Sequence, residues 1–324
     1  MTIYDIAIGV QLRMTHVPFL YLPLTALAVL SIACDLADDV YYPATKSVEQ
    51  TWTVGGSPGV AVAAFEGGIW VVPGDSGVIK VTVEVLSTSK KSKVVAQRLT
   101  DSLDVHLRRE GDSITVAITP NARYTKFSSV TASIRIEVPS GIRLDLSTDR
   151  GDIWVGYDRS GIIRRVSPVS IKARGNGIGN AIGIMTLPKP HIDAATVSRR
   201  EIVIQDSTSN VLIHASDYAL SVATAGRVNF TGTPARGVNT IYAGDAISLE
   251  LLSNVWFYAD HSAEPGALVR EPVHKRAERD GVKRLTGALH DGSDFVLELH
   301  SQSGVIHGLP ESTNRGRVGH SSIQ

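Results

Sequence analysis

The chain has 324 residues, enough for one large or two modest domains with a sizeable core. Lys and Arg together number 32, and Asp and Glu also number 32, so the formal net charge is zero. This balance argues against a nucleic-acid partner, because dedicated nucleic-acid binders usually carry a basic excess on one face. Cys34 is the only cysteine, which excludes an intrachain disulfide framework and a cysteine-based zinc site.

An uncharged apolar run at residues 17–33 leads directly into Cys34. The run is short for a membrane span and is typical of the apolar core of a secretion signal. The stretch Leu30-Ser31-Ile32-Ala33-Cys34 resembles the lipobox of bacterial lipoproteins, in which the cysteine after the cut becomes lipid-modified. We interpret residues 1–34 as an export segment with Cys34 as the lipidation candidate; an uncleaved anchor, a plain cleaved signal and a buried segment are the alternatives. The prediction is a membrane-anchored protein of the bacterial cell envelope, outside the cytoplasm.

Residues 35–47 are polar and predict a short tether between the anchor and the domain. Beyond it, valine, isoleucine, threonine, serine and glycine dominate, which favours an all-β protein. Alternating apolar residues predict strands through residues 48–143, including a hairpin at residues 105–118. Residues 90–104 are the one helix candidate, because apolar residues recur there at helical spacing. We expect this half to build one β layer with a single helix packed near it.

A repeating unit begins at Leu144. Leu144 and Leu146 alternate with polar residues, Gly151 forms a corner, and Ile153 and Val155 resume the alternation. Similar units recur on the order of 20 residues apart, as in repeat architectures. Short strands stacked in this way bury one continuous core. The sequence therefore predicts an all-β fold of the β-solenoid type, a β-helix-like stack, with one short helix in the N-terminal half; a β-sandwich is the alternative.

The strands around Ile69 and Val81, the helical segment near Leu99 and the repeated units such as residues 147–153 together resemble the bacterial putative-adhesin family, a domain of unknown function. The resemblance covers roughly residues 48–308 and implies a β-helical envelope protein without an established common activity. The middle of the chain departs from the pattern, because residues 198–202 lack the glycine.

The C-terminal part interrupts the β pattern twice. Residues 264–285 contain a run of mixed charges and predict a solvated loop that projects from the domain of residues 48–308. Residues 309–324 are polar and predict a disordered tail.

Three aspartates surround the corner glycine, in an order that superficially matches a calcium loop. Asp145, Asp149 and Asp152 lack a terminal bidentate glutamate, and Gly151 comes one position late, so solvated corner residues are the favoured interpretation. The glycine-rich residues 175–180 lack the lysine and the following helix of a phosphate-binding loop, and predict a turn. We therefore predict no catalytic, cofactor-binding or metal-ligating residue, and no cofactor.

The preferred function is a non-catalytic adhesion, interaction or envelope-stress-related surface protein, held to the membrane by its N-terminal lipid or anchor. Its expected partner is a protein or a polysaccharide at the cell surface. The alternative is a β-helical polysaccharide-binding protein or a polysaccharide lyase or hydrolase. Carboxylates that are distant in sequence can meet on the face of a β-helix, so an enzyme of this kind stays open.

Overall fold

The computed structural model is nearly all β, with one helix, α2 (Lys93–Asp101). It describes residues 41–56, 58–120, 128–175, 181–187, 200–206, 208–251, 255–258, 282–289, 294–303 and 305–307. The predicted β class and the helix in the N-terminal half are both confirmed. In the described ranges, no helix is long and apolar enough to cross a membrane.

The strands pair into two sheets, which we call sheet A and sheet B, and β13 contributes its first half to one and its second half to the other. Sheet A contains, in pairing order, β1 (Tyr42–Thr53), β4 (Val78–Ser89), β7 (Ser128–Val138), β3 (Ile69–Pro73), β9 (Ile153–Val155), β11 (Ala181–Met185), β13 (Asn210–Thr224), β14 (Val228–Pro234), β16 (Ile247–Leu251) and β20 (Ile306–His307). Sheet B contains β5 (Leu103–Glu110), β6 (Ser113–Pro120), β2 (Gly59–Glu66), β8 (Arg143–Arg150), β10 (Ser170–Gly175), β12 (Glu201–Asp206), β13, β15 (Gly237–Ala243), β19 (Asp294–Ser301), β18 (Val282–Leu289) and β17 (Val255–Tyr258).

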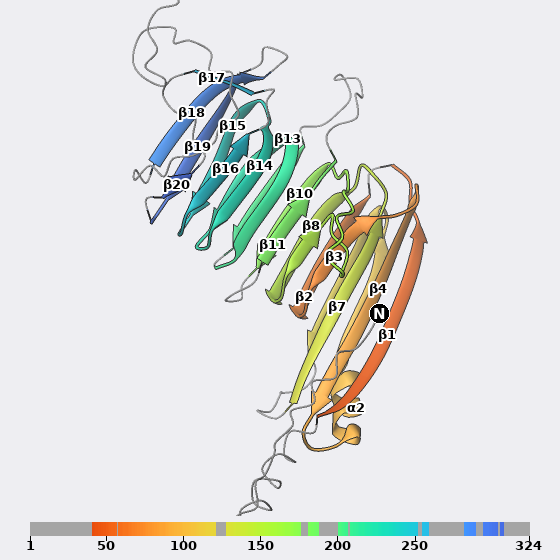
Figure 1. Cartoon of the computed structure of the whole chain (residues 1–324). Coiled ribbons are helices and arrows are strands. Elements are labelled where there is room, and N and C mark those ends of the chain that lie inside the picture. The colour runs from red at the N-terminus through yellow and green to blue at the C-terminus, as the bar shows by residue number, and fades with distance from the viewer. Residues whose placement is uncertain are drawn as a thin grey trace, which may run out of the picture.

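The central strands of each sheet run parallel, and the chain alternates between the sheets. A strand of sheet B is followed by a strand of sheet A, as in β2–β3, β8–β9, β10–β11 and β15–β16. We call each such pair a rung. The rungs lie side by side along the length of the molecule, and antiparallel strands flank them at both ends (Figure 1).

Matching residues of successive rungs stack in columns that form the core. Leu144 aligns with Val60 on one side and with Ile171 on the other. Ile153 likewise aligns with Ile69 and with Ile182 in sheet A. All of these side chains are buried. One short strand buries little apolar surface alone, so each rung depends on its neighbours.

The corners between the sheets also stack, and two devices hold them. First, the backbones of Gly67 and Gly151 approach so closely that a Cβ at Gly151 would lie 1.9 Å from the Gly67 carbonyl oxygen. Second, a buried hydroxyl at the end of the sheet-B strand donates to the corner carbonyl of the neighbouring rung. The Thr148 hydroxyl donates to the Gly67 carbonyl (3.3 Å), the Thr224 hydroxyl to the Ser209 carbonyl (2.5 Å) and the Ser301 hydroxyl to the Asp245 carbonyl (2.7 Å). The interpretation of Gly151 as a corner is confirmed.

The N-terminal half differs from the expectation in two ways. The prediction of one β layer is wrong, because β2, β5 and β6 enter sheet B while β1, β3, β4 and β7 enter sheet A. Alternation reports that a strand is buried on one face but not which sheet it joins. The helix is also shorter than residues 90–104: Ser92 caps its start and β5 begins at Leu103.

Several predicted boundaries meet the edges of the described residues. β1 begins at Tyr42, so the last part of the expected tether at residues 35–47 is strand that pairs with β4. Likewise β18 begins at Val282, within the charged loop of residues 264–285. The export segment at residues 1–34, with Cys34, and the tail at residues 309–324 lie outside the described residues.

Candidate functional site

Two of the three aspartates of the repeat unit contact the next rung. The Asp152 carboxylate accepts a hydrogen bond of 2.8 Å from the Ala181 backbone N–H of the next rung. The Asp145 carboxylate lies 3.8 Å from the Arg174 guanidinium on β10, while Asp149 is exposed. Across the described ranges, no group of three histidine, cysteine, aspartate or glutamate side chains is placed to hold a metal ion.

Two tryptophans meet on the outer face of sheet A. Trp70 on β3 and Trp154 on β9 are direct cross-strand partners, and each lies between two inward-facing residues of its strand. The sheet makes room for both rings with glycines. A Cβ at Gly68 or at Gly183 would lie 2.2 Å from the ring of Trp70 or of Trp154, respectively. The two indoles therefore lie close against the outer face of the sheet.

A loop at residues 156–166 folds beside these tryptophans, and Asp158 organises it. The Asp158 carboxylate accepts hydrogen bonds from the backbone N–H groups of Ser160 (3.0 Å) and Ile162 (2.9 Å) and from the Arg164 Nε (3.1 Å). It also accepts one of 2.6 Å from the Ser160 hydroxyl. These hydrogen bonds, that from the Ser160 hydroxyl foremost, hold the pKa of Asp158 below its usual value. The loop is thus held in one conformation by a charged residue.

The ordered loop presents Arg159 to the sheet. Its guanidinium lies 5.7 Å from the centre of the Trp70 ring and forms an ion pair with Glu84 on β4. Tyr157 makes an edge-to-face contact with Trp154, with 5.3 Å between ring centres. Three aromatic side chains and one arginine are therefore gathered from β3, β9 and the loop that follows β9.

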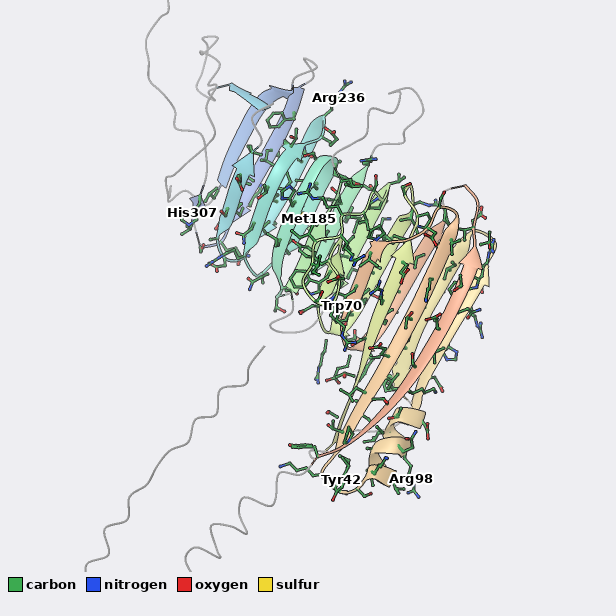
Figure 2. The ribbon with its side chains drawn as sticks, turned by 45° about the vertical axis from the view of Figure 1, so that its right-hand side comes forward. Tyr42, Trp70, Arg98, Met185, Arg236 and His307 are labelled. Atoms are coloured by element: carbon green, nitrogen blue, oxygen red, sulfur yellow. The ribbon has the colours of Figure 1, made fainter. Side chains whose placement is uncertain are left out.

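Between the loop and the sheet lies a hollow of about 120 Å³. We call it the Trp70 hollow; Figure 2 labels Trp70 beside the loop. Its surface combines apolar, hydroxyl and charged groups. The lining residues are Trp70, Val72, Thr82, Glu84, Ser133, Arg135, Asp158 and Arg159. An apolar surface with a few convergent polar groups is the usual composition of a small-ligand site.

The ion pair between Arg159 and Glu84 at the hollow can be broken at a small cost in free energy. Arg159 and Glu84 are both more than half exposed, as an ion pair at the rim of a site would be. Exposed ion pairs contribute at most about 1 kcal/mol to stability. The Arg159 and Glu84 side chains are therefore accessible and hold one another only weakly.

The residues of this site are widely separated along the chain, so no local pattern in the sequence predicts it. One signal was present: the triplet Ile-Trp-Val occurs at residues 69–71 and again at residues 153–155. When identical triplets occupy equivalent positions of two repeat units, they align with one another across neighbouring strands. The residues of the aromatic cluster are distant in the sequence and come together only in the folded chain.

No protein-family model matches the chain, and no curated protein matches it. Among solved structures it is similar to a putative adhesin from Parabacteroides distasonis, at 11% identity, with 64% of this chain and 78% of that chain covered and a TM-score of 0.31. It is also similar to a putative adhesin from Bacteroides fragilis (10% identity, 64% and 84% covered, TM-score 0.21). A third is a putative lipid binding protein from Parabacteroides distasonis (10% identity, 65% and 90% covered, TM-score 0.24). Two of these names match the family resemblance, but TM-scores this low assign neither a fold nor a function to this chain.

Proposed function

We propose that the protein is an exported, lipid-anchored β-solenoid of the cell envelope and that it acts as a non-catalytic interaction protein. The observation that carries this proposal is the Trp70 hollow, a mixed apolar and charged site on the outer face of sheet A. The stacked rungs form a rigid support for that face, since core columns and corners fix each strand against the next.

The anchor part of the proposal rests on the sequence around Cys34. Only residues 35–41 separate Cys34 from the start of β1, and an extended segment of that length spans at most about 28 Å. A lipid on Cys34 would therefore hold the end of the molecule that contains the start of β1 close to a membrane. A single acyl chain binds a membrane only marginally, so stable attachment requires a second signal, either another chain or a basic patch.

The composition of the hollow favours a saccharide unit of an envelope polysaccharide as the ligand. An indole offers a flat apolar surface for the C–H face of a sugar ring, and Trp70 and Trp154 lie next to one another. Glu84, Arg135 and Arg159 can form charge-assisted hydrogen bonds with sugar hydroxyls. We propose binding without turnover.

Mass spectrometry of the mature protein tests the anchor. We expect an N-terminal Cys34 that carries the lipid mass. An unmodified Cys34 within a longer N-terminus would refute the lipoprotein part of the proposal and leave the binding part to be judged separately.

A glycan array followed by a turnover assay tests the binding function. We expect saturable binding to an envelope saccharide and no release of product over time. Trp70→Ala should abolish the binding, while the matched control Tyr242→Ala, an exposed aromatic on the outer face of sheet B, should not. Reproducible product release would show an enzyme instead, and equal binding by wild type and Trp70→Ala would place the ligand elsewhere.

A further inference from the structure

We infer that the end of the molecule around α2 is a docking surface for an anionic lipid bilayer. We call this end the α2 pole and define it by four exposed apolar or aromatic residues and three lysines. They are Tyr41, Tyr42, Leu86 and Val94, with Lys90, Lys91 and Lys93. The inference goes beyond the proposed function, which supplies only the lipid anchor on Cys34, and it rests on that anchor for the proximity of the membrane.

The apolar residues of the α2 pole are strongly exposed. Val94 is 60% exposed, Tyr41 50%, Leu86 43% and Tyr42 40%. Tyr42 pairs with Ser89, three positions from Leu86, so both lie at the same end of sheet A, Tyr42 on the face of α2 and Leu86 on the other face. In Figure 2, Tyr42 and Arg98 of α2 lie at the same end of the molecule. Tyrosine and aliphatic side chains gathered in this way are typical of surfaces that enter the headgroup region of a bilayer.

The lysines lie where the helix itself disfavours them. Lys93 is the first residue of α2, Lys91 precedes the N-cap, and the first turn contains no acidic residue. The N-terminus of a helix carries partial positive charge, so acidic side chains stabilise it and lysines do not. Lys91 and Lys93 are both exposed, whereas the Lys90 ammonium lies 4.9 Å from the centre of the Tyr41 ring. A cluster that opposes the local electrostatics indicates an external anion, and a lipid phosphate supplies one.

The α2 pole is held rigidly to the stack. The buried Ser87 hydroxyl of β4 lies 2.6 Å from the Ala96 carbonyl and 2.6 Å from the Thr100 hydroxyl of the helix. Thr100 also donates to the Ala44 carbonyl of β1 at 3.4 Å. These hydrogen bonds hold the helix against the strands, so Val94 and the lysines are fixed on one side of this end of the sheet and Leu86 on the other.

A bilayer is the occupant that fits both the charge and the position. The lysines complement anionic headgroups, and the tyrosines and Val94 complement the apolar boundary below them. The chain also enters β1 at this pole, only a short segment after Cys34. An anchored protein would thus present the α2 pole, rather than either sheet face, to the membrane surface.

A single fluorescent label tests the inference on the full chain. Lipid-modified Cys34 has no free thiol, so a cysteine introduced by Val94→Cys is the only site for an environment-sensitive dye. The lipidated protein is reconstituted in phosphatidylcholine vesicles with or without phosphatidylglycerol. We expect a blue shift of the Val94 label only with phosphatidylglycerol, reversed by salt, and no shift of a matched label at Tyr242→Cys.

Charge variants sharpen the test. Lys91→Gln with Lys93→Gln should weaken the docking equilibrium by about thirtyfold without lowering the melting temperature, since neither lysine stabilises the helix end. The control pair Lys172→Gln with Arg174→Gln, exposed on sheet B, should leave docking unchanged.

Each other outcome has a distinct meaning. A Val94 label that is equally shifted without vesicles would show that protein covers the α2 pole, and would overturn the inference. The inference would also be overturned if the protein binds vesicles but the Val94 label shows the same emission with and without phosphatidylglycerol. The proposed lipid anchor would still be supported in that case. If Cys34 proves unlipidated, the Val94→Cys, Cys34→Ala chain is tested with added vesicles, and a salt-sensitive shift would support the α2 pole after the anchor has failed.

Discussion

The carbonyl oxygen of Gly67 occupies the space that a side chain at Gly151 would need. The two corners are also joined by a backbone hydrogen bond of 2.7 Å from the Gly67 N–H to the Arg150 carbonyl. Gly151 has a φ of +147°, a conformation that other residues rarely adopt. Both the contact and the conformation require glycine at this corner.

Gly151→Ala should therefore lower the free energy of unfolding by about 2–5 kcal/mol, the sum of backbone strain and a steric clash with fixed backbone. Gly55→Ala is the matched control, because nothing lies within 4 Å of a Cβ at that position. Urea unfolding of both variants measures the difference. Equal stability of the two would contradict the close approach of the corners.

Asn239 interrupts a column of apolar core residues and satisfies backbone groups there. Its Oδ1 accepts from the Leu220 N–H at 3.1 Å, and its Nδ2 donates to the Ala235 carbonyl at 2.8 Å. Asn239→Leu should cost about 1–3 kcal/mol, because these buried groups lose their partner. Asn229→Leu on the exposed face of β14 is the control. A stabilised Asn239→Leu variant would show that the column prefers an apolar residue throughout.

The sequence predicted the inward residues of the repeat correctly because alternation directly reports the buried face of a strand. Leu144, Leu146, Ile153 and Val155 are all buried. It could not predict the order of rungs. The β6–β7 rung stacks outside the earlier β2–β3 rung, and that pairing depends on contacts distant along the chain. Asn239 was missed for the same reason, since its role exists only once β13 and β15 are paired.

Tyr218 should make stability pH-dependent only at high pH. Its hydroxyl donates to the Pro168 carbonyl at 2.7 Å, and burial raises the pKa of Tyr218 from 10.0 to about 12. The folded state favours the neutral phenol, so this contribution is fully present below pH 10 and is lost as the pH rises towards about 12. The loss should total about 2–3 kcal/mol.

Denaturant unfolding of wild type and Tyr218→Phe across this range is the measurement. Wild type should lose stability between the two pKa values, and the Phe variant should lose less. Parallel pH profiles would mean that the Tyr218 phenol ionises equally in the folded and unfolded states.

We predict that Asp158 positions Arg159 by holding the conformation of the loop, and that it does not contact the apolar face of the ligand. Asp158→Ala removes the acceptor for Ser160, Ile162 and Arg164, so the loop loses its conformation. We expect faster hydrogen exchange at the Ile162 amide and weaker saccharide binding, with Trp70 still in place. The pKa of Asp158 is lowered in the folded state, so the same loosening should appear in wild type as the pH falls through that value. Unchanged exchange at Ile162 in Asp158→Ala would contradict this role.

The Trp70 hollow shows why the site was harder to predict than the fold. Its floor follows from the register of β7 with β3 and with β4, and its cover follows from a loop whose shape depends on Asp158. Neither register nor loop conformation follows from alternation alone. For Asp145, Asp149 and Asp152, the absence of a metal role stays a prediction, based on spacing that lacks the glutamate of a calcium loop.

The proposed binding function is tested most directly by hydroxyl-radical footprinting of the full chain with and without the saccharide that the array selects. Bound saccharide should protect Trp70, Trp154 and Tyr157, which gather beside the hollow, and should leave Tyr242 and His300, stacked 4.2 Å apart on sheet B, unprotected. Protection of Tyr242 and His300 instead, or no saccharide that binds at all, would contradict the assignment of the Trp70 hollow as the ligand site.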